Sequence, residues 1–446
     1  MEYSTRCILI TSEYQILNSK GNNNMKRILL GTTTLIGAFG LFTGAALAET
    51  PKVTLGGYAN FEAGYDSDNL NRAGVADPTL PIADKARPQA FRSDTEISVK
   101  IDGKSDAGLG YGGEVDLLAD TSADVQGRGV NASKTFVYLE GNPWGRVELG
   151  SNVGADGAMK VDAGTIARAT GGIDGDWSYF ANANHQYLAG SALPLGYGTL
   201  NSTGLGNTNF TGDHTEENLN KITYYTPRFA GFQVGVSYLP DQTNRGQGAS
   251  QVWAGAPYGP DRTQNAGQSQ NIFTGGLSYD NKFNQVGVAL AATGEHGAAE
   301  NHLYEDLKAW NVGGKLSYLG FSVATSYGSW GKSNTLTTVD SKDTSYYTAG
   351  AAYEFGPFGA SVTYLHSTFD CGNGTGGSGS DFGNTANCTN GVAGKDKFNN
   401  LSIGTDYKLA PGLTPYAEVS FFDENPAGGA VDNKGTVGIV GTQLNF

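Results

Sequence analysis

The sequence predicts an all-β fold, a transmembrane antiparallel β-barrel of sixteen strands, and three observations support this prediction. Stretches in which apolar and polar residues alternate recur from residue 53 to the end of the chain. The connections between these stretches are alternately short and long. The last stretch ends on an aromatic residue, Phe446, as expected of a final barrel strand that ends at a membrane–water interface.

Each predicted strand follows from a period of two, which places alternate side chains on opposite faces. In the seventh strand, for example, Phe232, Val234 and Val236 alternate with small or polar residues. The sixth is ambiguous in phase and contains Pro227. In chain order, we expect strands at residues 53–66, 91–103, 109–119, 133–140, 145–151, 218–229, 232–240, 270–280, 284–295, 307–319, 321–331, 343–355, 358–369, 396–409, 412–423 and 434–446. Most of them are long enough to cross a membrane when tilted.

Connection length distinguishes the two ends of the predicted barrel. The long connections are residues 67–90, 120–132, 152–217, 241–269, 296–306, 332–342, 370–395 and 424–433, and a short turn separates each from the next. Aromatic residues gather at the short turns, among them Phe229, Phe232, Phe355 and Phe358. Short turns at one end, long loops at the other and an aromatic girdle are typical of outer-membrane barrels. Such a sheet must close, because lipid offers no hydrogen bonds to a free strand edge.

The beginning of the chain predicts export. Met25, Lys26 and Arg27 give a basic start, residues 28–48 carry no charge, and Ala46-Leu47-Ala48 is a small-x-small cleavage site. We therefore expect a secretory signal peptide at residues 25–48 and a mature barrel domain at residues 49–446. Residues 1–24 have no place in this scheme, and we expect them to be an upstream artefact of the assigned translation start. An uncleaved membrane anchor is the alternative.

Composition excludes several classes of protein. Glycine accounts for 66 of 446 residues, there are 23 Tyr and 20 Phe, and the mean hydropathy is −0.32. No long apolar run follows the leader, which excludes a helical membrane protein. The formal charge is −14, and it becomes −16 once the four basic and two acidic residues of positions 1–48 are removed. This negative charge argues against nucleic-acid binding and favours cations as the permeating species.

Two segments resemble Gram-negative porins of the sixteen-stranded general-diffusion type, closest to those of alphaproteobacteria. Residues 136–152 contain FVYLEG and WGRVELGSN, and residues 221–229 read KITYYTPRF. The opening LGGY at residues 55–58 and the final Phe446 add to the resemblance. It implies a homotrimer of water-filled barrels in the outer membrane, among lipid and lipopolysaccharide, with a third loop folded into the lumen. Residues 152–217, the third and longest connection, correspond to that loop.

A protein of this kind is a channel for passive diffusion of small hydrophilic solutes and ions, and not an enzyme. Its selectivity comes from pore width and from charges at the constriction. Strand phase directs four basic wall candidates into the lumen: Arg92, Lys100, Lys134 and Arg146. The third loop supplies four acidic candidates: Asp156, Asp162, Asp174 and Asp176. A basic wall facing an acidic loop would set a transverse field, and we expect weak cation selectivity.

The alternative for the wall residues is ordinary pairing with lumen acids, namely Glu96, Glu114, Asp116, Glu140 and Glu148. Phe446 is expected to serve barrel assembly as the C-terminal aromatic. Cys371 and Cys388 flank an external loop in an oxidising compartment, which predicts a disulfide. No cofactor is expected, and no metal ligands are assigned, although acidic loop pairs such as Asp66 and Asp68 leave structural calcium open.

Two other functions stay open at this point. Aromatic residues in the third loop, Trp177, Tyr179, Phe180 and Tyr187, would suit a substrate-specific channel for sugars or cations. An outer-membrane enzyme would need a converged nucleophile or a cluster of acids. The sequence offers only His366-Ser367-Thr368 for that purpose, without a supporting acid in phase.

Overall fold

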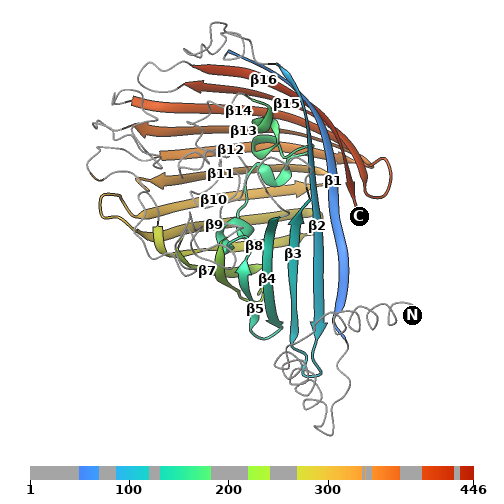
Figure 1. Cartoon of the computed structure of the whole chain (residues 1–446), viewed down its shortest axis with the longest axis vertical. Helices are drawn as coiled ribbons and strands as arrows, with labels where there is room; N and C mark the ends of the chain where they lie inside the picture. The colour runs from blue at the N-terminus through green and yellow to red at the C-terminus, as the bar shows by residue number, and fades with distance from the viewer. Residues whose placement is uncertain are drawn as a thin grey trace, which may run out of the picture. The chain divides into compact units, whose positions relative to one another are not determined.

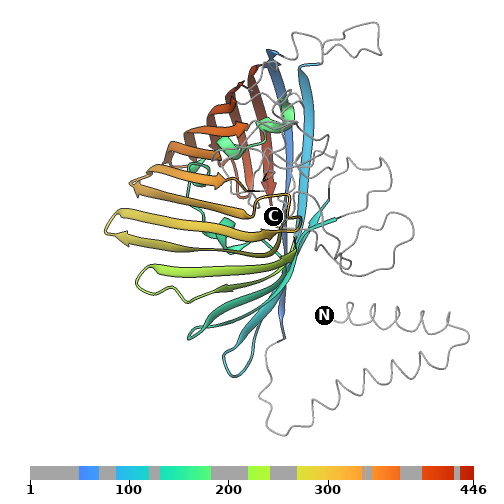
Figure 2. The same cartoon turned by 90° about the vertical axis from the view of Figure 1, so that its left-hand side faces the viewer.

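The computed structural model describes residues 50–69, 87–119, 131–181, 219–241, 269–333, 337, 344–371, 394–425 and 432–446. The strands are β1 (Lys52–Asp68), β2 (Gln89–Lys104), β3 (Gly110–Leu118), β4 (Asn131–Gly141), β5 (Gly145–Ser151), β6 (Asn220–Tyr225), β7 (Phe232–Asp241), β8 (Ser269–Phe283), β9 (Val286–Ala299), β10 (Leu307–Tyr318), β11 (Phe321–Gly331), β12 (Thr344–Phe355), β13 (Phe358–Cys371), β14 (Gly394–Tyr407), β15 (Leu413–Asn425) and β16 (Asn433–Asn445). They are neighbours in chain order, and Figures 1 and 2 show this succession from two sides.

The barrel is closed by β1 and β16, which pair antiparallel from Tyr58 opposite Asn445 to Asp68 opposite Gly435. Phe446 extends this pairing through two backbone hydrogen bonds with Gly57, at 3.1 and 3.2 Å. The predicted fold class, an antiparallel sixteen-strand barrel, is confirmed. The clearest difference is β6, which is shorter than expected. It ends at Tyr225, two residues before Pro227, because proline has no N–H for the ladder.

Residues Pro51–Gly103 and Leu109–Phe446 form the barrel unit. Thr50 and the turn Lys104–Gly108 belong to a second unit, where the Gly108 N–H donates to the Ser105 carbonyl at 2.8 Å. The predicted leader lies outside the described residues, so its cleavage stays a prediction. No helix among the described segments is long and apolar enough to cross a membrane.

Side chains of the barrel are arranged inside out compared with a water-soluble protein. Large apolar residues such as Phe61, Val137 and Val323 are more than half exposed on the outer face. Serine, threonine and acidic residues are buried on the inner face, including Thr223 and Ser237. An outer apolar face around a polar interior is the arrangement that lipid outside and water inside stabilise.

The two ends of the barrel differ as predicted. Short turns join β4 to β5, β8 to β9, β10 to β11 and β12 to β13, whereas the segments after β1, β3, β5 and β7 are long. In the β10–β11 turn, Leu319 and Gly320 have φ values of 47° and 86°, as a two-residue type I′ hairpin requires. Exposed aromatic residues surround this end, among them Phe229, Phe321 and Phe355.

Candidate functional site

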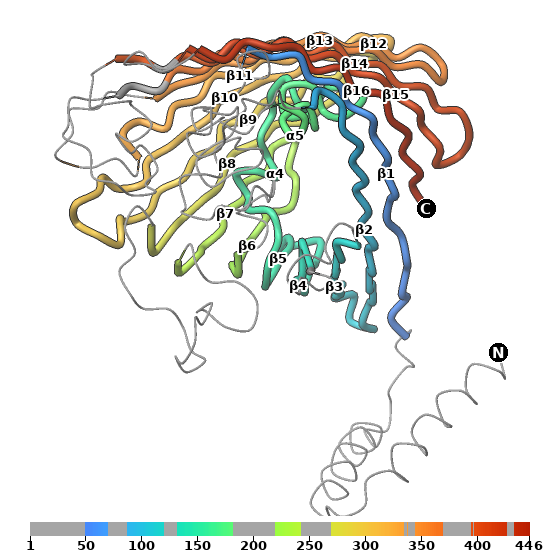
Figure 3. Tube along the Cα trace, turned by 45° about the horizontal axis from the view of Figure 1, so that its top comes forward, coloured from blue at the N-terminus to red at the C-terminus, as the bar shows by residue number. Residues whose placement is uncertain are grey.

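The segment that follows β5 lies inside the barrel. It contains four short helices, α4 (Ala155–Met159), η2 (Gly164–Ile166), η3 (Gly172–Asp174) and α5 (Trp177–Phe180). Helix α4 contacts β6 to β9, η2 contacts β11 and β12, η3 contacts β13 to β15, and α5 contacts β1 and β16. Figure 3 shows α4 and α5 on the inner side of the strands. Residues 152–181, here called the inner segment, therefore follow the inner wall of the barrel.

Inward hydroxyl groups of the strands hold the backbone of the inner segment. Short helices leave N–H groups without partners of their own, and Ser or Thr side chains on the wall accept from four of them. These hydrogen bonds are Ala155 N to Ser237 Oγ at 2.8 Å, Ala163 N to Thr348 Oγ1 at 3.1 Å, Arg168 N to Ser361 Oγ at 2.9 Å and Ile173 N to Thr363 Oγ1 at 3.1 Å. The acceptors lie on β7, β12 and β13, so the anchoring is spread along the wall.

Glu418 on β15 is the strongest single anchor of the inner segment. Its carboxylate accepts from the Thr170 hydroxyl at 2.8 Å, from the Gly172 N–H at 3.1 Å and from the Thr170 N–H at 3.3 Å. Glu418 is 1% exposed. Three hydrogen bonds converge on this one carboxyl group, so the cluster fixes the turn that leads into η3.

Packing fixes the far end of the inner segment. Trp177 is fully buried and stacks on Phe398 and Phe422, with ring centroids 6.0 and 5.7 Å away. Two wall glycines make room for the segment. A Cβ at Gly64 would collide with the Phe180 ring, and one at Gly313 would collide with the carbonyl oxygen of Val161. Since Trp177 belongs to the packed core of the segment, it is not available as a sugar-binding surface.

Arg92 joins the wall to the inner segment. Its guanidinium lies 3.3 Å from Asp176, 3.0 Å from Asp94 and 3.5 Å from Glu62, and 4.0 Å from the Tyr179 ring centroid. Burial, followed by a hydrogen bond with Glu62, raises the pKa of Asp176 to about 9, although Arg92 opposes the shift. The shift favours the protonated form of Asp176.

The other three predicted wall residues pair with acids of the wall. Lys100 lies 3.4 Å from Glu114, and Lys134 lies 3.6 Å from Asp116. Arg146 contacts Glu148 at 2.7 Å and Glu140 at 3.1 Å, and its guanidinium lies 3.8 Å from the Tyr138 ring centroid. Glu96, the fifth acid considered, accepts from the Ser133 hydroxyl at 2.9 Å. This geometry matches the alternative of local pairing. Of the four, only Arg92 forms an ion pair with the inner segment among the described residues.

The four predicted loop acids separate into two groups. Asp156 and Asp162 are both buried. The Asp156 carboxylate has no hydrogen-bond partner among the described residues. The Asp162 carboxylate lies 2.8 Å from the Lys160 ammonium group. Burial alone would lower the pKa of Lys160. The nearby Asp162 and Asp174 raise this pKa by more than burial lowers it, so Lys160 stays charged. Asp174 and Asp176 keep partial exposure. These two are the loop acids that water can reach.

Fully buried charged groups are strongly biased towards acids. Among the described residues they are a single lysine, Lys221, and eleven acids: Glu62, Asp66, Asp68, Asp116, Glu148, Asp156, Asp162, Glu295, Glu300, Glu418 and Glu424. Among the described residues, carboxyl groups therefore outnumber cationic groups at the buried positions. The period of two places Glu418 on the inner face of β15 but does not distinguish it from other inward acids.

Several predictions fall outside what the structure describes. Cys388 lies among the residues that are not described, as do residues 182–217 with Tyr187. No group of three or more His, Cys, Asp or Glu side chains within the described ranges could hold a metal ion. Ser367 is buried on the inner face of β13, whereas His366 on the same strand contacts Asn399 at 2.8 Å. Because neighbours on a strand point to opposite faces, these two cannot form a nucleophile–base pair.

Comparison with known proteins identifies similar sequences and folds. Residues 32–427 match the family described as Gram-negative porin. Uncharacterized proteins of Rickettsia bellii and Rickettsia felis are 27% and 28% identical to the chain; each alignment covers 95% of this chain and all of the relative.

Solved structures share the fold at low sequence identity. An anion-selective porin from Comamonas acidovorans superposes with a TM-score of 0.53 at 16% identity, over 89% of this chain and 100% of that one. OmpT, an outer membrane protein of Vibrio cholerae, reaches 0.54 at 9% identity, over 91% and 100%. Its trimer form reaches 0.51 at 10% identity, over 89% and 100%.

Proposed function

Because the chain belongs to the Gram-negative porin family, we propose that this outer-membrane β-barrel is a weakly cation-selective channel for passive diffusion of small hydrophilic solutes and ions. The excess of acids among its buried charged groups carries the proposal. Carboxylates in a narrow aqueous lumen attract cations, and salt screens the attraction. Selectivity in such pores depends on charges that line the narrow part.

We place the passage between the inner segment and the wall formed by β2 to β5. Two observations support this placement. The helices of the inner segment contact the strands from β6 to β9 and from β11 round to β1. The strands β2 to β5 instead present charged pairs, such as Lys100 with Glu114 and Arg146 with Glu148. Of the two partly exposed loop acids, we assign selectivity at neutral pH to Asp174, and Asp176 contributes once the pH exceeds its raised pKa of about 9.

Reversal potentials in planar bilayers test this function. Under a gradient of dilute KCl, the wild-type channel should prefer potassium. Asp174→Asn should shift the reversal potential towards anions, and the shift should vanish near molar salt because of screening. At neutral pH Asp176→Asn should change the potential less than Asp174→Asn, since Asp176 is already protonated. An anion preference in the wild type, or no change on removing both carboxylates, would contradict the assignment.

We also propose that three barrels assemble as a homotrimer. A trimer form exists for the structurally similar Vibrio cholerae protein. Native mass spectrometry in detergent should give three times the mass of the mature chain. A monomeric mass in several mild detergents would contradict the trimer without affecting the channel proposal.

A further inference from the structure

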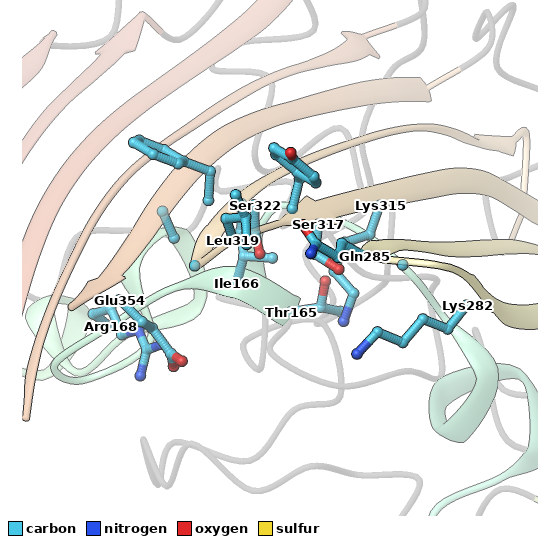
Figure 4. Close-up of a pocket in the computed structure, with 15 residues that line it drawn as sticks. Thr165, Ile166, Arg168, Lys282, Gln285, Lys315, Ser317, Leu319, Ser322 and Glu354 are labelled. Atoms are coloured by element: carbon cyan, nitrogen blue, oxygen red, sulfur yellow. The ribbon is translucent and has the colours of Figure 1, made fainter. Parts of the chain in front are cut away.

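A cavity of about 620 Å³ opens inside the barrel at the end that carries the short turns. Its lining comes from η2, from the β8–β9 turn, from the β10–β11 turn and from β12. Figure 4 shows the side chains that surround it, with Lys282 and Lys315 extending towards the space beside Thr165. The cavity therefore lies on the short-turn side of the inner segment, away from the Arg92–Asp176 contact.

The charges that line this cavity are mainly positive. Arg168, Lys282 and Lys315 contribute three cationic groups, and Glu354 is the only acid of the lining. Arg168 is already neutralised, because its guanidinium pairs with Glu354 and lies 3.8 Å from Asp406. The ammonium groups of Lys282 and Lys315 therefore give the cavity a net positive charge.

Local structure explains why the two lysines lack acidic partners. Across the strands, Lys315 faces Ala289 and Ala324, and Lys282 faces Gly287, so no carboxylate lies opposite either of them. Asp280, two residues before Lys282, forms no ion pair with either lysine. Within the described part of the chain, Lys282 and Lys315 therefore differ from Arg92, Lys100, Lys134 and Arg146, each of which has an acid within 3.6 Å.

Neutral hydrogen-bonding groups complete the lining. Ser317 and Ser322 face each other across β10 and β11, and Gln285 lies in the β8–β9 turn. Hydroxyl and amide groups donate to oxyanions, while two ammonium groups supply the charge. Ile166 and Leu319 provide apolar contact. The volume admits a phosphate or a small dicarboxylate together with part of its hydration shell.

We propose that Lys282 and Lys315 form a binding site for small divalent oxyanions, on the short-turn side of the constriction. The inference rests on the proposed channel function, which brings solutes into the lumen. Two cations held by the same cavity favour a divalent anion over chloride, because each charge adds a favourable contact. The lumen is otherwise acidic, so the site gives anionic solutes a favourable position on the short-turn side of the inner segment. The channel then conducts cations and retains a path for small polyanions.

Calorimetric titration of the detergent-solubilised mature protein with inorganic phosphate tests the site. Binding should weaken by about tenfold in the K282Q/K315Q variant, as expected for the loss of two solvent-exposed charge contacts. The control is K408Q, which removes one lysine charge from the β14–β15 turn at the same end of the barrel, outside the cavity. K408Q should bind as the wild type does. The K282R/K315R variant, which keeps both charges, should also keep binding, and circular dichroism verifies that each variant is folded.

Bilayer recordings separate this inference from the channel proposal. Phosphate added at the short-turn side should reduce the potassium current of the wild type reversibly, and less so in K282Q/K315Q. A conducting channel that does not bind phosphate, or equal binding by K282Q/K315Q and the wild type, would overturn the site and leave the channel intact. Equal loss in K408Q would also overturn it, since the effect would then be general. A protein that binds phosphate but never conducts would instead refute the proposed function.

Discussion

Removing the Glu418 carboxylate should loosen the inner segment without opening the barrel. In Glu418→Ala, three donors lose their acceptor: the Thr170 hydroxyl, the Thr170 N–H and the Gly172 N–H. A hydrogen bond contributes about 1 kcal/mol net, so three lost bonds amount to about 3 kcal/mol. We take about 3 kcal/mol as the net loss of anchoring, which corresponds to about a hundredfold rise in the detached population of this turn.

Single-channel recording measures the consequence. Glu418→Ala should show larger current noise and a higher mean conductance, because the segment that narrows the lumen moves more freely. Ile173 and Trp177 should still hold the segment near the wall, so the effect should be smaller than loss of the whole segment. Asp423→Ala is the matched control, because Asp423 lies on the same strand and contacts Lys434 at 3.1 Å and Asn425 at 2.9 Å but not the inner segment. Conductance and noise equal to the wild type in Glu418→Ala would refute the reasoning.

Three further changes have defined outcomes. Cation preference should rise as the pH passes about 9, because the raised pKa of Asp176 keeps it neutral below that value; Asp176→Asn should lack this step while keeping the later titration of lysines. Gly313→Val should displace the inner segment and change single-channel conductance. Gly438→Val, whose added Cβ would meet no atom within 4 Å, should leave conductance unaltered. Alkylation of the mature protein without reductant should find no free thiol if Cys371 and Cys388 are joined; labelling of both would show that the disulfide does not form.

The period of two and the connection lengths determined most of the fold. Sixteen strands could be placed because every strand of a membrane barrel needs one apolar face. This requirement produces an alternation of apolar and polar residues that can be recognised within each strand. The same local signal predicts an inward direction for Arg92, whose guanidinium contacts Asp176 of the inner segment. It missed the end of β6, where proline interrupts the ladder, and the bounds of other strands such as β9.

Only the tertiary structure decided which inward charges meet. Glu418 lies 248 residues from Thr170 in sequence, and no periodic pattern relates them. The same holds for Arg92 and Asp176, which pair because the inner segment passes β1 and β2, and for Lys282 and Lys315, which share a cavity only after their strands pair with β9. Side-chain direction is a property of one strand and can be predicted from it. Pairing depends on the register of distant strands and on the path of a loop, and these are fixed only when the barrel closes.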